Sequence, residues 1–315
     1  MIFWVLTAAF AYETDPLTDR HIPLADVTEA ASLVVNERLA QAVAETNART
    51  RCDATPQRTL RILAREVHDH TGRAATIPSR GLVRGHGYTV YSTWLETDDG
   101  VDRRSFLDTR DDIFSDLDIT ESLILATAGT SSTFQLAGVV VGSDKPDHFW
   151  DLGYAYFRKS GWGEHPERGI AHGVATERGI YGLATSRAFS YADLSANYAG
   201  FQWYARLLTD QSELQLDADG CVVQVAPFDW STWVTWDWDE ALNPPLFTPV
   251  VERGVQRHLL ANRDDYCASY HVWATAEDRA RLEASLSARP TYATGAPTDR
   301  SDPYRLDALC SGSRG

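Results

Sequence analysis

The chain has 315 residues, of which 43% are hydrophobic and 23% are charged. This composition supports a folded protein with one large core or two modest ones. The formal net charge is −15, from 44 acidic and 29 basic side chains, and a negative field of that size repels phosphate backbones and anionic lipid surfaces. We therefore expect no nucleic-acid partner.

An apolar run from Ile2 to Ala11 opens the chain, and Ala9-Phe10-Ala11 fits the small-x-small pattern of a signal-peptidase site. We expect residues 1–11 to be a signal peptide cut after Ala11, although the usual basic residues before the run are missing. A buried N-terminal strand or helix is the alternative. Export would place the mature protein in the periplasm or cell envelope.

The chain contains four cysteines, and three of them lie in its last third. An even number of cysteines in an exported chain predicts two disulfides, with three ways of pairing them. We expect one of the two bridges to staple the C-terminal region. The cysteines are Cys52, Cys221, Cys267 and Cys310.

Apolar residues recur at three- and four-residue steps over 23–48, which predicts a helix. A cap and a proline at Thr55-Pro56 predict a second helix, which ends at Thr71-Gly72. Residues 81–100 alternate in polarity and are rich in aromatic side chains, so we expect one or two strands there.

Residues 123–143 carry no charge and are numerous enough to span a bilayer. Threonine and serine side chains crowd the middle of this stretch, however. We therefore expect a buried or interfacial helix followed by a short Val139–Val141 segment, and we disfavour membrane insertion.

Three helices are predicted next, over 144–160, 166–185 and 190–209, and their short connections predict antiparallel neighbours. Four glycines fall on the middle segment, and each lowers helix propensity by about 1 kcal/mol. Close approach of a neighbouring backbone is the usual reason for such glycines, and a ligand on the same face is the less common one.

Beyond residue 210 the pattern predicts a hairpin over 214–228 and helices over 248–260 and 276–286. We therefore predict a mainly helical α+β fold, with a central helix trio and small hairpins. Residues 12–210 would form a mainly helical domain, and residues 211–315 a Trp-rich α+β region packed on it.

The helix trio carries polar residues at spacings that place them together. Asp144 and His148 lie four residues apart and share a helix face, as do Asp193 and Asn197, while Glu177 falls within the middle helix. Adjacent helices can direct these side chains toward one point. The predicted site comprises Asp144, Lys145, His148, Glu177, Asp193 and Asn197.

Such a group suits general acid/base chemistry, with Glu177 as the acid or base. Asp144, His148 and Asp193 would orient it, activate water, or bind one divalent metal through oxygen and nitrogen ligands. Lys145 and Asn197 would bind substrate, as would Trp230 and Trp233 if the Trp-rich stretch formed a stacking platform for sugars. A buried hydrophobic cluster is the favoured interpretation of that stretch.

Each polar residue also has a purely structural interpretation. Asp144 is placed to cap a helix, Ser190 and Asp193 form a capping-box pattern, Glu177 could be a solvated partner of Arg178, and His148 could be a hydrogen-bonded core histidine. The structural interpretation is favoured for each residue alone. For the whole set the two interpretations are balanced.

The helix trio contains three spaced motifs: Asp144-Lys145-x-x-His148-Phe149, then Glu177, then Ser190-x-x-Asp193-x-x-x-Asn197-x-x-Gly200. These motifs resemble the VanZ-like pattern and are similar to those of uncharacterised bacterial envelope lipoproteins. The likeness covers residues 140–205 and implies an envelope setting and a shared polar site, without a named reaction. VanZ-like helices span membranes, whereas these carry several charged side chains.

The sequence is compatible with two functions. The first is an exported hydrolase acting on a glycan or lipid-linked envelope substrate, and the second is a non-catalytic periplasmic binding or scaffold protein with a buried structural polar network. Convergence of the polar residues beside an open cleft would favour the hydrolase. Mutual pairing inside a sealed core would favour the scaffold.

Overall fold

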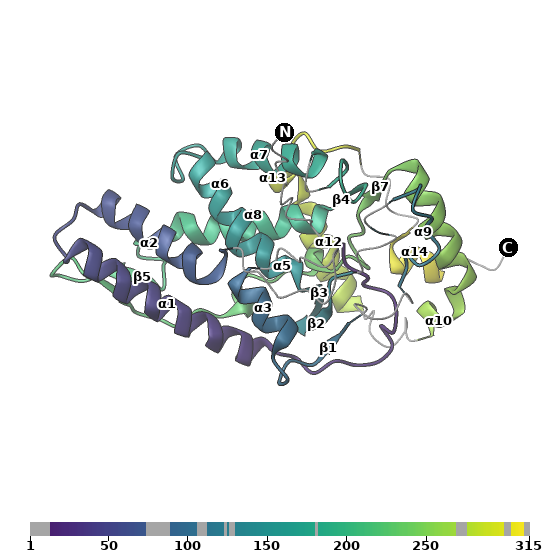
Figure 1. The fold of residues 1–315 in the computed structure, drawn as a ribbon, viewed down its shortest axis with the longest axis horizontal. Helices are drawn as coiled ribbons and strands as arrows, with labels where there is room; N and C mark the ends of the chain where they lie inside the picture. Colours follow the sequence, from purple (N-terminus) through teal and green to yellow (C-terminus); the bar gives the residue numbers. More distant parts are fainter. Residues whose placement is uncertain are drawn as a thin grey trace, which may run out of the picture.

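The structure is a computed structural model, and it describes residues 13–73, 89–105, 112–122, 125, 130–179, 182–268, 276–298 and 304–311. The protein is a mainly helical α+β fold with small antiparallel sheets and a large aromatic cluster, as the sequence predicted. The chain is elongated in Figure 1, from the α1–α2 end to the end formed by α9 and α14. The expected signal peptide lies outside the described residues.

Helices account for most of the described chain. They are α1 (Thr28–Thr50), α2 (Pro56–Thr71), α3 (Val90–Thr97), α5 (Asp144–Asp147), the π-helix η1 (His148–Leu152), α6 (Gly153–Lys159), α7 (Pro166–Arg178), α8 (Tyr191–Arg206), the 3₁₀ turns η2 (Trp230–Thr232) and η3 (Trp236–Trp238), α9 (Pro249–Ala261), α10 (Arg263–Cys267), α12 (Ala276–Ser287), α13 (Arg289–Tyr292) and α14 (Leu306–Ser311).

The described strands are short and pair in antiparallel fashion. A three-stranded sheet has the order β1-β2-β3, and two further pairs join β4 to β7 and β5 to β6. The strands are β1 (Arg103–Arg104), β2 (Thr133–Leu136), β3 (Val139–Gly142), β4 (Ala188–Phe189), β5 (Leu214–Leu216), β6 (Val222–Gln224) and β7 (Leu246–Phe247).

The second helix begins and ends where the sequence predicted, whereas α1 begins at Thr28, five residues after the predicted start. The Thr55 side chain accepts a hydrogen bond from the backbone N–H of Arg58, and Pro56 occupies the first turn, where a missing N–H costs nothing.

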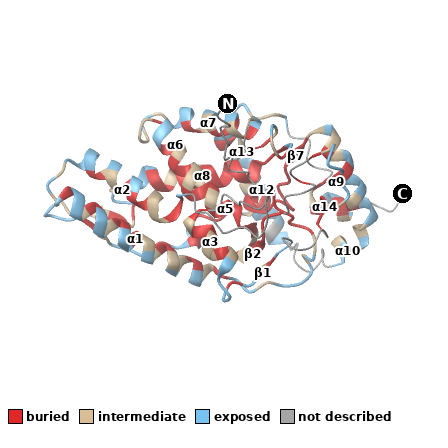
Figure 2. Cartoon of the chain, in the orientation of Figure 1, coloured by how far each residue is buried: buried red, intermediate tan, exposed pale blue. Residues whose placement is uncertain are grey.

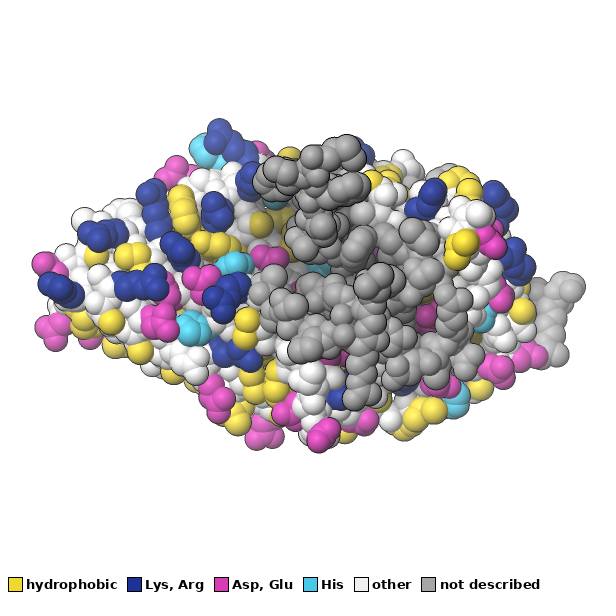
Figure 3. All heavy atoms as spheres, viewed as in Figure 1, with side chains coloured by type: hydrophobic (Ala, Val, Ile, Leu, Met, Phe, Trp, Pro, Cys, Tyr) yellow, Lys and Arg dark blue, Asp and Glu magenta, His cyan; other side chains and the backbone are white. Residues whose placement is uncertain are grey.

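The surface over α1, α2 and α6 carries both acidic and basic side chains on the face shown in Figure 3.

The prediction of strands over 81–100 is wrong for its described part, because α3 forms there. The Thr89 side chain accepts from the N–H of Ser92, and the Ser92 side chain accepts from the N–H of Thr89, which makes a complete capping box. Tyr91 and Leu95, four residues apart, are both buried on one face of the helix. The cap and this spacing outweigh the strand preference of the aromatic residues. Residues 81–88 lie outside the described part.

The helix predicted before Val139 is wrong for its described residues 133–136, which form β2, and the predicted Val139–Val141 segment lies in β3, the second strand of the same hairpin. Ala137 and Gly138 connect the strands with φ angles of 54° and 77°, the arrangement of a type I′ turn. Residues 123–124 and 126–129 are not described. Among the described residues, no helix combines the length and apolar character needed to cross a membrane.

The three expected helices are present and packed together, and the first is divided into α5, η1 and α6. The second ends at Arg178, where Gly179 follows, rather than continuing to residue 185. A Cβ at Gly169 would lie 2.9 Å from the Tyr156 carbonyl oxygen, and one at Gly200 would lie 1.9 Å from that of Phe149. Close backbone approach therefore explains these glycines, and it fixes α8 directly against η1.

The main core is aromatic and includes residues on both sides of residue 210. Figure 2 shows much of α8, which contributes to this core, as buried. Phe149 and Trp150 of η1 pack edge-on against Trp230, whose Nε1 donates to the Tyr91 hydroxyl at 2.9 Å. The Trp-rich stretch thus contributes to a hydrophobic cluster, as the favoured interpretation had it. This core fixes η1 and α8, the two elements that position most of the polar residues.

Two disulfides are present, as expected. Cys52–Cys221 joins the end of α1 to the β5–β6 hairpin, and Cys267–Cys310 joins α10 to α14 and so staples the C-terminal region. Disulfides persist in oxidising compartments, so this pair is consistent with an exported protein.

Candidate functional site

The predicted polar residues converge on one buried cluster between α5, η1, α7 and α8. Asp144 and Lys145 open α5, His148 opens η1, Glu177 lies in the last turn of α7, and Asp193 lies in the first turn of α8. Each of these five residues is buried. The cluster also contains Ser190, whose capping pattern the sequence showed, and four residues that the sequence did not single out, namely Glu13, Thr14, Tyr156 and Glu240.

The Lys145 ammonium lies among three carboxylates. Its Nζ is 2.7 Å from Asp144 Oδ2, 2.7 Å from Asp193 Oδ1 and 3.1 Å from Glu240 Oε1. The chain has only two lysines, against many arginines. A compact ammonium with three N–H groups suits three carboxylates that approach from different elements, whereas a planar guanidinium suits one.

His148 is held from both sides of its ring. Its Nδ1 donates to Asn197 Oδ1 at 2.9 Å, and its Nε2 lies 3.2 Å from Asp193 Oδ2. Asn197 Nδ2 in turn donates to the Tyr156 hydroxyl at 3.3 Å, which fixes the amide. Burial opposes a charge on His148, but the neighbouring Asp193 carboxylate outweighs it and raises the pKa of His148 to about 10.

The pKa values of Asp193 and Glu177 are shifted in opposite directions, although the two carboxyl groups lie in the same cluster. Burial acts to raise the pKa of Asp193, but the charges of His148 and Lys145 outweigh it and hold that pKa well below its usual range. Burial, followed by the charge of Asp193, raises the pKa of Glu177 to about 8. The backbone N–H of Ser190 donates to the Glu177 carboxylate and ties α7 to the start of α8.

Glu240 and Glu13 also have raised pKa values. Burial raises the pKa of Glu240 to about 7 against the attraction of Lys145, and its Oε1 accepts from Ser190 Oγ at 2.6 Å. Burial, with the charges of Glu240 and Asp193, raises the pKa of Glu13 well above its usual value. Both groups therefore tend to hold a proton near neutral pH.

The cluster holds more acidic than basic groups. Five buried carboxyl groups face one ammonium and one imidazole, so full ionisation would leave an excess of negative charge in a buried site. Proton uptake by some of the carboxyl groups relieves that excess. The carboxyl groups belong to Glu13, Asp144, Glu177, Asp193 and Glu240.

Two of the structural interpretations are wrong. Ser143, not Asp144, occupies the cap position of α5, and the Asp144 carboxylate instead accepts from Thr14 Oγ1 at 3.0 Å and from Lys145. Glu177 is no solvated partner of Arg178, whose guanidinium donates to the Gly295 carbonyl. The capping role of Ser190 is confirmed, since its Oγ accepts from the N–H of Asp193.

Three residues of the cluster could hold a divalent metal. Ligand atoms of Asp144, His148 and Asp193 lie within 4.8 Å of one another, and one nitrogen with two oxygen ligands suits a transition metal. The hydrogen bond from His148 Nδ1 to Asn197 is the kind of outer contact that orients a histidine ligand. Lys145 already supplies a positive charge between the two aspartates.

Comparisons of the chain with protein-family models, curated proteins and solved structures found no match. The likeness to the VanZ-like pattern therefore depends on the motif residues alone. Those residues do lie together in the structure.

Only weak sequence signals pointed to Glu13, Thr14 and Glu240. Glu13-Thr14 is the first polar pair after the apolar run, and Glu240 ends an acidic, Trp-rich stretch. Neither lies near the helix trio in sequence, and local periodicity carries no information on such distant contacts.

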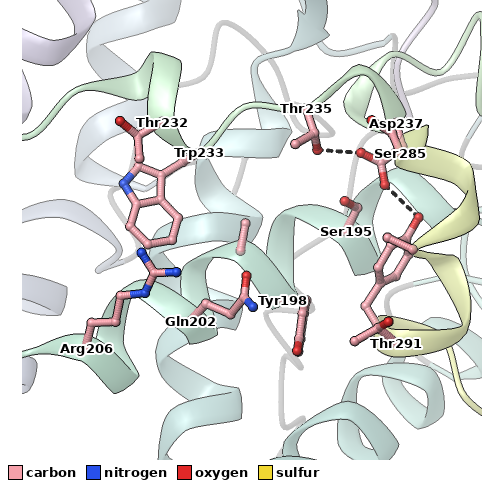
Figure 4. Close-up of a pocket in the computed structure, with 13 residues that line it drawn as sticks. Ser195, Tyr198, Gln202, Arg206, Thr232, Trp233, Thr235, Asp237, Ser285 and Thr291 are labelled. Carbon is pink, nitrogen blue, oxygen red and sulfur yellow. Dashed lines mark hydrogen bonds between the residues drawn. The ribbon is translucent and has the colours of Figure 1, made fainter. Parts of the chain in front are cut away.

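The two tryptophans predicted to bind substrate lie apart from the cluster. Trp230 is wholly buried in the aromatic core. Trp233 lines a pocket on the other side of α8 (Figure 4).

Proposed function

We propose that the polar cluster is the acid/base centre of an exported hydrolase acting on a glycan or lipid-linked substrate of the cell envelope. The observation that carries the proposal is the opposite displacement of two neighbouring carboxyl groups, with the pKa of Glu177 raised to about 8 and that of Asp193 lowered. Carboxyl groups whose pKa values are pushed apart are suited to separate acid and base roles.

In this proposal Glu177 is the group that moves a proton. It is protonated at neutral pH and gives that proton to the leaving oxygen as the scissile bond breaks. The attacking water then returns a proton to the Glu177 carboxylate, which restores the starting state. Asp193 stays ionised and stabilises positive charge that develops on the substrate, as in the two-carboxyl pattern of glycosidases.

The other members of the cluster keep these two groups in place. His148 and Lys145 hold Asp193 ionised through the contacts at 3.2 and 2.7 Å. Asn197 orients the imidazole, and Asp144 anchors the ammonium. Each of these is a positioning role, because each acts through Asp193.

The second candidate is a non-catalytic binding or scaffold protein with a structural polar network. The deep burial of the cluster and the continuous contacts from Asp144 through Lys145, Asp193 and His148 to Asn197 favour it. Protonation of Glu13, Glu177 and Glu240 would leave two carboxylates against Lys145 and His148, so charge balance alone does not separate the two candidates. What favours the catalytic proposal is that strongly displaced pKa values cluster at functional sites.

Hydrolysis by wild-type protein and by Glu177→Gln tests the proposal. The substrates are para-nitrophenyl glycosides, para-nitrophenyl esters and purified peptidoglycan, and the readouts are nitrophenolate and reducing ends. We expect wild type to hydrolyse at least one of them and Glu177→Gln to lose about 100-fold or more of that rate, the usual contribution of a general acid.

Glu167→Gln is the matched control, because Glu167 lies on the same helix with an exposed side chain. It should retain the wild-type rate. No hydrolysis of any substrate, together with a Glu177→Gln protein that is markedly less stable, would favour the scaffold instead. Equal rates for wild type and Glu177→Gln would also contradict the proposed role.

A further inference from the structure

A pocket lies between α8, the segment that contains η2 and η3, and helices α12 and α13, with a volume of about 320 Å³. Ser195 and Gln202 of α8 line it, while Asp193 and Asn197 of the same helix face the polar cluster. At 3.6 residues per turn these two pairs point to opposite sides of α8. The pocket is therefore separate from the cluster.

Aromatic rings form much of the pocket wall. Trp233 lies on one side, and Tyr198 and Tyr292 complete the aromatic lining. Figure 4 shows Trp233 across the pocket from Asp237 and Thr291, with Ser195 between them. The Arg206 guanidinium lies 4.9 Å from the Trp233 ring centre, so this cation is engaged at the mouth.

A buried carboxylate lies on the opposite side. Asp237 is 2% exposed, and its Oδ2 accepts from the Tyr292 hydroxyl at 2.7 Å. Its Oδ1 accepts from the Thr235 hydroxyl, the second contact drawn in Figure 4. These two bonds hold the carboxylate in a fixed orientation, and each oxygen keeps capacity for a further donor.

Other polar side chains of the lining have no partner among the described residues. They include the Ser195 hydroxyl, the Tyr198 hydroxyl and the Gln202 amide, all three on α8. Ser195 is only 6% exposed, so its hydroxyl is available chiefly from the pocket itself. Buried polar groups are normally hydrogen-bonded, so the buried Ser195 hydroxyl calls for a partner in the pocket. Tyr198 and Gln202 are half-buried, and their polar groups can bond a ligand or water there.

We propose that this pocket binds a neutral mono- or disaccharide. Sugar hydroxyls both donate and accept, which matches hydroxyl and amide side chains, and they donate to a fixed carboxylate such as Asp237. The apolar faces of sugar rings pack on aromatic rings such as Trp233. The volume lies at the small end of ligand sites, about 300–1,000 Å³.

Charge selects against an anionic ligand. The protein has a formal net charge of −15, and Asp237 adds a negative charge inside the pocket. Arg206 keeps its positive charge while it stacks on Trp233, but it lies across the pocket from Asp237 (Figure 4). A phosphorylated sugar would meet repulsion that a neutral sugar avoids. The saccharide site is independent of the proposed hydrolase, so either can fail without the other.

The test is a titration of the purified protein with glucose, N-acetylglucosamine, maltose and chitobiose, followed by tryptophan fluorescence and calorimetry. We expect at least one of them to bind with a Kd below about 1 mM. Gln202→Ala should weaken that binding about tenfold by removing one hydrogen bond to the ligand. Ser195→Leu should abolish it by filling the pocket.

Gln256→Ala is the matched control, because Gln256 is exposed on α9, which does not line the pocket. It should bind as wild type does, and glucose 1-phosphate should bind wild type more weakly than glucose. The proposal is overturned if none of the four saccharides binds wild type, or if Gln202→Ala binds as tightly as wild type. Tighter binding of glucose 1-phosphate would overturn the neutral ligand class.

Discussion

Replacing Lys145 with methionine is expected to lower the free energy of unfolding by about 3–5 kcal/mol, the range for breaking a buried ion pair on one side. The ammonium is wholly buried and contacts Asp144, Asp193 and Glu240. Methionine preserves most of the side-chain volume but leaves these carboxylates with His148 as their main counter-charge. Urea denaturation of both proteins at pH 7 measures the difference.

Lys159→Met is the control, since Lys159 is the only other lysine and is exposed on α6. It should change stability by no more than about 0.5 kcal/mol. Lys145→Arg should not restore stability, because the planar guanidinium cannot reproduce three separate contacts. A loss below about 1 kcal/mol for Lys145→Met would show that the ammonium does not hold the cluster together.

Replacing Cys52 and Cys221 together with serine should cost about 5 kcal/mol of stability by the chain-entropy relation. This bridge closes a sequence separation of 169 residues, and its removal leaves the β5–β6 hairpin attached to α1 only through non-covalent contacts such as those of Asn47 with Val222. Thermal unfolding of the oxidised wild type and the double variant gives the comparison.

Replacing Cys267 and Cys310 is the matched experiment. Their separation is 43 residues, so the same relation gives a smaller loss of about 4 kcal/mol. Both losses should disappear when wild type is compared with the variants in the presence of a reductant. An unchanged melting temperature for the Cys52/Cys221 variant would show that this bridge does not stabilise the mature protein.

Local sequence signals were sufficient for much of the helical structure. The Thr55-Pro56 start predicted α2, and the four-residue spacing of Asp193 and Asn197 placed both side chains on one face of α8. The four-residue spacing of Asp144 and His148 also placed their side chains on one face, although the two residues belong to α5 and η1. The backbone between them is α-helical, because the π-helix begins only at His148. Short connections and shared faces were enough to anticipate the convergence of these residues.

Contacts between distant segments were not predictable from these signals. Thr14 meets Asp144 across a sequence separation of 130 residues, and Ser190 meets Glu240 across 50. The β2–β3 hairpin was missed because an uncharged stretch fits a buried helix as well as buried strands, and only the two-residue turn at Ala137-Gly138 distinguishes them. The two disulfides also join residues that are far apart in the sequence, so their pairing was not predictable from local signals either.

The central claim is that Glu177 holds a proton within a cluster that has surplus carboxyl groups. Its pKa is about 8 in the folded protein against the ordinary 4.5, and that of Glu240 is about 7. Between the ordinary and the raised pKa values the folded state binds more protons than the unfolded state. The free energy of unfolding therefore falls as pH rises from about 5 to 8. Each group contributes a slope of at most about 1.4 kcal/mol per pH unit.

The most direct test is the free energy of unfolding of wild type and Glu177→Gln, measured by urea denaturation from pH 5 to 8. His148, Lys145, Asp193, Glu13 and Glu240 surround Glu177 in both proteins, so the difference isolates Glu177. The account predicts similar stabilities near pH 5 and a more stable Glu177→Gln protein at pH 8. If the free energies of unfolding of the two proteins change in parallel with pH, or if Glu177→Gln is less stable than wild type at every pH, Glu177 does not hold a proton in the folded protein as we propose.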